Sequence, residues 1–172
     1  MKKIKYIIGY LLYNFVFGLL PHYQLGLKWP ISNALRRISC KLMFIKSGKK
    51  IDIGRKIKMS SKISIGDFSS IGDFSYIQGK VEIGNNCMIA PKVTFIGSNH
   101  NFSRKDIPMN KQGENSIGIT VKDDVWIGYG AVILDGVTIE SGAVIGAGSI
   151  VTKNVGKNEV VAGAPAKMIK RR

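Results

Sequence analysis

Branched apolar residues recur at every sixth position along most of this chain. The first series of these anchors is Ile53, Met59, Ile65, Ile71, Ile77, Ile83, Ile89 and Phe95. The series resumes, two residues out of phase, as Val121, Ile127, Ile133, Ile139, Ile145 and Val151. Four residues after each anchor stands a second residue, mostly small or β-branched, as at Ser69, Cys87 and Ala131. A period of six matches neither an α-helix nor a simple alternating strand.

This pattern predicts a parallel β-helix built from hexapeptide repeats, in which the chain turns three corners in every coil. The anchors are expected to point into a narrow prism, and the residues four positions later to fill the space near its corners. Glycine follows many anchors, as at Gly54, Gly66 and Gly72. We expect these glycines to supply the backbone dihedral angles that tight corners need. The fold class is therefore an all-β core of about five coils over residues 51–172.

Residues 1–50 form a separate basic segment in which we expect helices. The chain holds 26 Lys and Arg against 11 Asp and Glu, a net charge of +15, and its first acidic residue is Asp52. Such a charge favours an anionic partner. No nucleic-acid-binding module is visible, so lipid headgroups are the better candidate and no nucleic acid is expected.

The apolar stretch Tyr6–Leu20 has two interpretations. It is shorter than the ~20 residues of a membrane-spanning helix, and Pro21-His22-Tyr23 follows it in place of a small-residue cleavage site. It is either an amphipathic helix lying on an anionic membrane surface or a helix that caps the open first coil. A second helix is expected from about Ser32 to Lys46.

The six-residue register fails between Phe95 and Val121, where a polar loop over residues 97–118 interrupts the coils. A loop of this length inside a repeat array is usually functional. It carries His100, one of two histidines in the chain, at the point where the coil opens into the loop. Since an imidazole titrates near neutral pH, His100 can accept a proton from an attacking hydroxyl. The alternative is a solvated loop histidine. The two cysteines form no metal-ligand pattern, so no metal is expected.

Four motifs carry a resemblance to a known family. They are Ser98-Asn99-His100, Val125-Trp126-Ile127-Gly128, the segment from Gly146 to Lys153 and the segment from Ala162 to Lys167. With the repeats, they resemble the hexapeptide-repeat acyltransferases, which implies a left-handed β-helix. Within that family the chain is similar to sugar O-acetyltransferases near the maltose, galactoside and streptogramin acetyltransferases. The basic N-terminus and the loop segment Asp106-Ile107-Pro108 resemble enzymes of capsule, O-antigen or exopolysaccharide synthesis.

The resemblance implies a homotrimer whose active sites lie between subunits, with His100 as general base and acetyl-CoA as co-substrate. It places coenzyme contacts at Tyr129, Ala147, Thr152, Lys153, Lys167 and Lys170. The C-terminal tail is expected over residues 157–172, and the alternative for its basic cluster, Lys167 to Arg172, is a frayed solvated end. The resemblance places Ser70, from the neighbouring subunit, at the acceptor. Asn99 flanks His100 and could hydrogen-bond a sugar hydroxyl; the alternative is an asparagine that satisfies a turn. Galactoside-type relatives carry asparagine at the position of Ser70, so the acceptor pocket is expected to differ.

The expected function is transfer of an acetyl group from acetyl-CoA to a hydroxyl of a sugar in a surface polysaccharide or its precursor. Acetyl-CoA is cytoplasmic, so we expect a cytoplasmic protein, with peripheral attachment to the inner face of the cell membrane if the N-terminal helix binds lipid. The alternatives are acetylation of a xenobiotic, N-acetylation of an amino sugar, and a non-catalytic β-helix scaffold. A zinc carbonic anhydrase on this fold needs three histidine ligands, and the chain has His22 and His100 alone.

Overall fold

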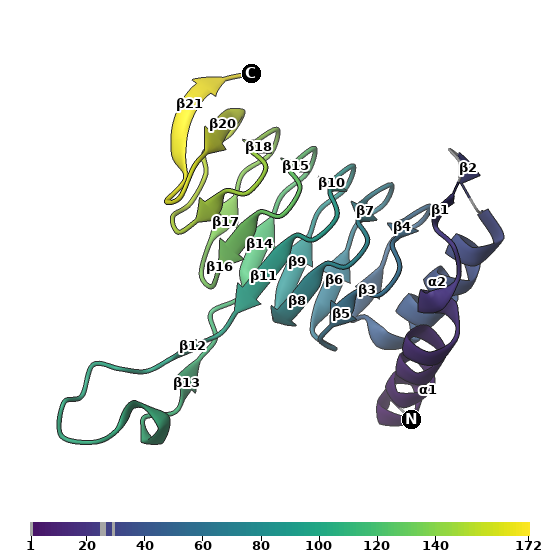
Figure 1. Ribbon diagram of the computed structural model, residues 1–172, viewed down its shortest axis with the longest axis horizontal. Coiled ribbons are helices and arrows are strands. Elements are labelled where there is room, and N and C mark those ends of the chain that lie inside the picture. Colours follow the sequence, from purple (N-terminus) through teal and green to yellow (C-terminus); the bar gives the residue numbers. More distant parts are fainter. Residues whose placement is uncertain (1, 25–26, 29) are drawn as a thin grey trace.

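A computed structural model of the chain describes residues 2–24, 27–28 and 30–172. Its main body is a parallel β-helix of five coils whose short strands form three sheets along the sides of a prism (Figure 1). The first sheet holds β3 (Lys46–Ser47), β6 (Ile63–Ile65), β9 (Val81–Ile83), β14 (Ile119–Val121) and β17 (Thr138–Ile139). The second sheet holds β4 (Asp52–Ile53), β7 (Ser70–Ile71), β10 (Met88–Ile89), β15 (Trp126–Ile127), β18 (Val144–Ile145), β20 (Glu159–Ala162) and β21 (Lys167–Arg171). The third sheet holds β5 (Lys58–Met59), β8 (Tyr76–Gly79), β11 (Thr94–Gly97), β16 (Val132–Leu134) and β19 (Ile150–Val151).

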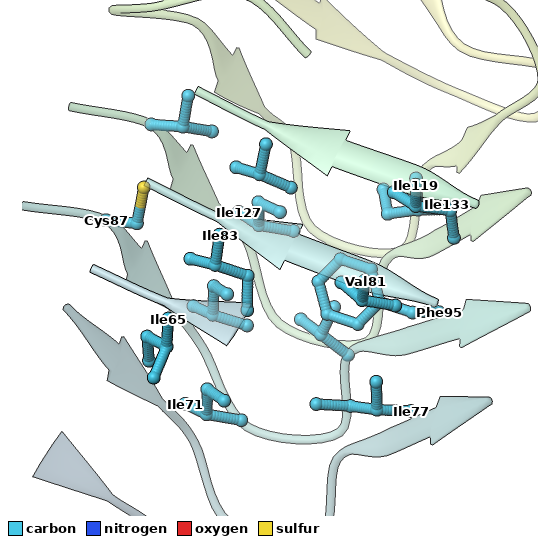
Figure 2. Close-up of a cluster of buried hydrophobic side chains, with 14 of the residues drawn as sticks. Ile65, Ile71, Ile77, Val81, Ile83, Cys87, Phe95, Ile119, Ile127 and Ile133 are labelled. Carbon is cyan, nitrogen blue, oxygen red and sulfur yellow. The ribbon is translucent and has the colours of Figure 1, made fainter. Parts of the chain in front are cut away.

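The hexad anchors fill the inside of the prism, as the sequence predicts. Ile53 pairs with Ile71 and Ile71 with Ile89, so equivalent residues of successive coils lie side by side. Figure 2 shows Ile65, Ile71 and Ile77, one from each side of a single coil, among the buried apolar side chains. Every anchor is buried except Met59, which is partly buried against the same core. Burying one such isoleucine contributes about 1.5–3 kcal/mol, so the stacked coils stabilise one another.

The glycines that follow the anchors were expected to supply unusual backbone dihedral angles at the corners, and this reason is wrong. Gly54 and Gly72 do not have positive φ; the left-handed residues at the neighbouring corners are mostly not glycine, for example Phe74 (φ 60°) and Lys92 (φ 58°). A Cβ on Gly72 would lie 2.3 Å from the nitrogen of Pro91 in the next coil. The glycines are therefore required because the backbones of adjacent coils approach closely there.

The N-terminal segment covers the open end of the first coil (Figure 1). It comprises α1 (Lys2–Phe15), the 3-10 helix η1 (Phe17–Leu19), the strands β1 (Tyr23–Gln24) and β2 (Leu27–Lys28), and α2 (Pro30–Met43). The buried Tyr13 hydroxyl donates to the Gly54 carbonyl (2.7 Å) and accepts from the Ile57 N–H (3.0 Å). The fully buried Arg36 donates through Nε to the Ile53 carbonyl (2.6 Å) and through Nη1 to the Leu20 carbonyl (3.1 Å). Because these donors reach the first coil and η1, α1 and α2 cap the prism.

Capping uses only one side of α1. The Tyr13 side faces the coil, and Gly9 allows close contact with α2, since a Cβ there would lie 2.8 Å from that of Leu42. The opposite side of α1 exposes Ile4, Ile7, Ile8, Leu11 and Phe15 to solvent, and Leu19 of η1 is exposed as well. These six residues are called the apolar stripe. Among the described residues, no helix has both the length and the apolar content needed to cross a membrane.

The far end of the prism is closed by a hairpin. β20 continues the second sheet in parallel with β18, and β21 pairs with β20 in the antiparallel direction. The C-terminal tail therefore does not fray: most of residues 157–172 belong to this ordered hairpin, although the side chains of β21 are exposed. The first coil begins at Lys46, in β3, a few residues before the boundary expected at residue 51.

Candidate functional site

The long loop leaves the prism at the third corner, where the chain passes from the third sheet to the first. Paired residues of adjacent coils are normally 18 positions apart, as for Ile71 and Ile89. Across the loop they are 38 apart, as for Ile89 and Ile127. The loop thus inserts 20 residues between two coils that still stack directly, which explains the two-residue phase change in the sequence.

Hydrogen bonds from the coils fix both ends of the loop. The Gln78 side chain donates to the Ser98 hydroxyl (3.0 Å) where the chain leaves the coil. The Asp135 carboxylate accepts from the N–H groups of Ile117 (2.9 Å) and Gly118 (2.7 Å) where the chain returns. The loop therefore has a defined base against the third corner.

Beyond this base the loop forms an antiparallel ribbon that projects away from the prism (Figure 1). Its strands are β12 (Asn99–His100) and β13 (Glu114–Asn115), and the 3-10 helix η2 (Met109–Lys111) lies near the tip. His100 and Asn99, both sequence candidates, are exposed on β12. His100 Nε2 lies 3.6 Å from Glu114 Oε1. The ribbon thus presents the imidazole outside the prism, with a carboxylate beside it.

Ser70, the other acceptor candidate, lies in β7 on the second sheet and shares a pocket with a partly buried charge cluster. The pocket is also lined by His22, Asp52, Asp73 and apolar side chains of β7 and β10. The His22 ring donates through Nδ1 to Asp73 (2.7 Å) and through Nε2 to Asp52 (2.9 Å). These two hydrogen bonds raise the pKa of His22 to about 9, so its ring is cationic at neutral pH. Within one subunit this pocket and His100 belong to different sides of the prism.

Tyr129 and Ala147 occupy successive turns of the second corner, between the second and third sheets. The Gly148 N–H donates to the Tyr129 carbonyl (2.8 Å), which joins the two turns. The exposed Tyr129 ring lies 5.5 Å from the Lys92 ammonium, and hydrogen bonding to the Tyr129 side chain raises the pKa of Lys92. Among the described residues, the N–H groups of Tyr129 and Ala147 donate to no other residue. Two backbone N–H donors on one corner suit carbonyl oxygens, such as those of the two amides in a pantetheine arm.

Thr152 and Lys153 lie at a different corner from Tyr129 and Ala147. They follow β19 and occupy the third corner, two coils beyond the exit of the loop, and both are exposed. The Tyr129–Ala147 corner and the Thr152–Lys153 corner thus lie at the two ends of the third sheet. A coenzyme that contacts both corners would have to cross the outer surface of that sheet.

Lys167 and Lys170 are brought to one side of β21 by an irregularity in the hairpin. Lys167 pairs with Ala162 and Lys170 with Val160, and the register shifts between Val160 and Val161. Residues three apart in a regular strand point to opposite faces, but the extra residue of a bulge restores the same face. The two ammonium groups can thus serve a single anionic group such as a phosphate.

The sequence offers two loop acids, Asp106 and Glu114, to orient His100 but gives no spacing argument for either, and the ribbon register places Glu114 beside the ring. Sequence reasoning missed two further features of the site. Gln78 and Asp135 fix the loop base from neighbouring coils. The pairing of His22 with Asp52 and Asp73 joins residues 30 and 51 positions apart, and none of the three stands in a motif.

Comparisons with known proteins agree with this architecture. The family model for the bacterial transferase hexapeptide (six repeats) matches residues 62–97 and 118–153. A maltose O-acetyltransferase from Clostridium difficile 630 superposes with a TM-score of 0.81 at 27% identity, covering 99% of this chain and 87% of that chain. A galactoside acetyltransferase in complex with coenzyme A has a TM-score of 0.72 at 32% identity, covering 99% of this chain and 82% of that chain. WbbJ of Escherichia coli, assigned to O-acetyl transfer in lipopolysaccharide biosynthesis, is 35% identical over 53% of this chain and 50% of its own length.

The chain belongs to the hexapeptide-repeat acyltransferase family, in the group that includes the galactoside and maltose O-acetyltransferases. Since mirror-image coils do not superpose, the structural match also fixes the hand of the solenoid as left-handed, as the resemblance implied. The chain spans about half the length of the curated relatives that it matches.

Proposed function

We propose that this protein transfers an acetyl group from acetyl-CoA to a hydroxyl of a sugar in a surface polysaccharide or its precursor. The observation that carries the proposal is the placement of a lone imidazole, His100, on a ribbon pinned to the coils of a hexapeptide-repeat acyltransferase. The relation to WbbJ favours a polysaccharide acceptor. Acetyl-CoA is cytoplasmic, so the reaction would take place there.

In the proposed step His100 acts as general base. It takes the proton from the acceptor hydroxyl as that oxygen bonds to the thioester carbonyl carbon; the C–S bond then breaks and the proton passes to the leaving sulfur. Tyr129 and Ala147 would hold the pantetheine arm through their backbone, while Thr152, Lys153, Lys167 and Lys170 would meet its far end and the phosphates. Holding acceptor and thioester in line supplies much of the acceleration.

We further propose that the active unit is a homotrimer. Outward side chains of the first sheet are polar, as at Ser64, Glu82 and Thr120, whereas the second and third sheets expose Met88, Trp126, Tyr76 and Ile150. Apolar surface on two sides of a prism favours packing against further copies. This packing would bring Ser70 and its pocket next to the His100 ribbon of a neighbour, with Asn99 beside the acceptor.

The function is tested by acceptor-dependent thiol release from acetyl-CoA with His100→Ala and, as a matched control on the same loop, Lys105→Ala. Acceptors would include galactosides, maltose and surface polysaccharide. Loss of the base should lower kcat by about 10²–10⁴-fold, while the control keeps native rates. Equal rates for native protein and His100→Ala would contradict the role of His100, and failure of the native protein with every acceptor would contradict the proposed activity.

The apolar stripe of α1 is proposed as a contact surface for an anionic membrane. The residues of the stripe are exposed. Lys3 and Lys5 belong to the same helix, and they line a pocket together with Lys41 of α2. A 14-residue helix is about 21 Å long and suits the plane of the interface. Basic residues next to an apolar stripe match anionic headgroups above acyl chains.

Sedimentation with vesicles tests this contact. Native protein should pellet with vesicles containing anionic lipid, less at high salt and little with neutral vesicles. The double variant Ile4→Asp/Ile8→Asp should remain in the supernatant, whereas Ile31→Asp, another exposed isoleucine in the cap, should pellet normally. Equal pelleting of both variants, or a change of oligomeric state without any vesicle binding, would contradict a lipid partner.

A further inference from the structure

The loop ribbon sets a carboxylate against the proposed general base, and the family assignment does not predict this pairing. We infer that Glu114 is a positioning residue for His100: it holds one ring nitrogen so that the other can accept the acceptor's proton. This inference rests on the proposed role of His100 and extends it to a second side chain.

The register of the ribbon carries the inference. Asn99 pairs with Asn115 and His100 with Glu114, so the two titratable side chains are directly opposite each other. Directly opposed residues of an antiparallel pair project from the same face, with Cβ atoms about 4.5–5.5 Å apart. Their polar atoms, His100 Nε2 and Glu114 Oε1, are 3.6 Å apart. Catalytic hydrogen bonds are often long before substrate binds, and a small side-chain rotation would close this one.

The ribbon is held rigidly enough to maintain the pair. Gln112 bridges its two arms: its side chain accepts from the Arg104 N–H (3.0 Å) and donates to the carbonyls of Arg104 (2.7 Å) and Ile107 (3.0 Å). The Asn101 N–H donates to the Gly113 carbonyl (3.0 Å) directly beyond His100 and Glu114. Together with the base fixed by Gln78 and Asp135, these bonds enclose the pair between two anchored ends.

None of the other charged side chains of the ribbon can take the place of Glu114 as the hydrogen-bond acceptor for His100. Asp106, the only other acid of the loop, forms an ion pair with Arg104. Lys105 and Lys111 are exposed cations near the tip and cannot accept a proton from an imidazole. Glu114 is the carboxylate that lies against the ring.

A carboxylate in this place has two chemical effects. By accepting the N–H of one ring nitrogen, it selects the tautomer whose other nitrogen is unprotonated and can act as a base. When the ring then takes the acceptor's proton, the negative charge stabilises the imidazolium that forms. Because both side chains are half or more exposed, the effect is smaller than in a buried pair until substrate covers them.

Acetyl transfer by Glu114→Gln provides the test, with Asp106→Asn as a control that removes the same charge from the same loop. Glu114→Gln should lower kcat on the order of tenfold, below the 10²–10⁴-fold contribution of the base itself. The KM for acetyl-CoA should stay constant, because the carboxylate acts on the base and not on the coenzyme. Glu114→Asp should recover part of the rate.

The outcomes separate this inference from the proposed function. If His100→Ala is inactive while Glu114→Gln has native kcat, the positioning role is wrong and the general base stands. If Glu114→Gln and Asp106→Asn lower kcat equally, the effect is one of loop charge, and the inference is again wrong. If His100→Ala keeps native activity, the proposed general base fails first.

Discussion

The coils and the inserted ribbon are held together by opposite means. In the coils, apolar side chains point inward and the backbones of neighbouring turns pair at a constant spacing. In the ribbon nearly every side chain is exposed. Its conformation is held by a few individual hydrogen bonds, among them those made by Gln112, Gln78 and Asp135. The comparison teaches that burial fixes the scaffold, while a few polar contacts place the chemistry. The two regions should therefore respond differently to substitution.

The largest effect is expected inside the coil from which the loop departs. Phe95 is fully buried in β11, two residues before the loop begins. Phe95→Ala should lower the free energy of unfolding by about 3–5 kcal/mol, since it removes contacts and leaves a cavity. Chemical denaturation measures the loss, and the exposed Phe102→Ala of the ribbon is the matched control. A loss below about 1 kcal/mol would mean that the coils tolerate cavities more readily than their close packing indicates.

An intermediate effect is expected at the His22 cluster, which joins the N-terminal cap to the first coils. Hydrogen bonds with Asp52 and Asp73 raise the pKa of His22 to about 9. A raised pKa means that this stabilisation is complete below the unfolded value near 6.5 and disappears as the pH rises through about 9. The free energy of unfolding of the native protein should exceed that of His22→Gln by up to about 3 kcal/mol near pH 6.

Unfolding of both proteins between pH 5 and 10 measures this difference. At the acid end, burial raises the pKa of Asp73, but hydrogen bonds from His22 and Arg55 together bring it below its ordinary value of 3.8. That part of the stabilisation is therefore lost only as the pH falls below about 4. An advantage that is the same at pH 6 and pH 10 would show that the charge of His22 contributes nothing.

The smallest effect on global stability is expected in the ribbon itself. Gln112→Ala removes three hydrogen bonds between the arms, yet it should change the free energy of unfolding by less than about 1 kcal/mol, because an exposed loop opens locally. Amide hydrogen exchange should nevertheless become faster at Asn101 and Arg104. Unchanged exchange at both amides would mean that the pairing of β12 with β13 is sufficient to hold the ribbon.

The repeat pattern made the coils predictable and left the rest open. A side chain that points into the prism must be apolar in every coil, so Ile71 or Ile133 can be placed from the sequence period alone. The helix expected from about Ser32 to Lys46 forms over Pro30–Met43. The expected and observed boundaries differ because the packing of Arg36 and its neighbours also determines where the helix begins and ends.

The site was predictable only where a motif marks it. His100 stands out because it interrupts a repeat, but its partner Glu114 depends on how the loop folds back on itself. The spacing of apolar residues predicts one helical face of Ile4, Ile8, Leu11, Leu12, Phe15 and Leu19. In the structure Ile7 is exposed and Leu12 is half-buried, because the side of α1 that carries Tyr13 faces the coil. Such pairings join distant residues through geometry that no local period encodes.

After the loop, the chain re-enters the solenoid at β14, which pairs in register with β9. The alignment of the coils therefore does not depend on the length of the insertion. Ile119 pairs with Val81 whatever lies between Gly97 and Gly118, so residues can be gained or lost in that interval while the stack keeps its phase. A scaffold of this kind can exchange one protruding arm for another, and with it the molecule that the arm meets, at little thermodynamic cost to the coils.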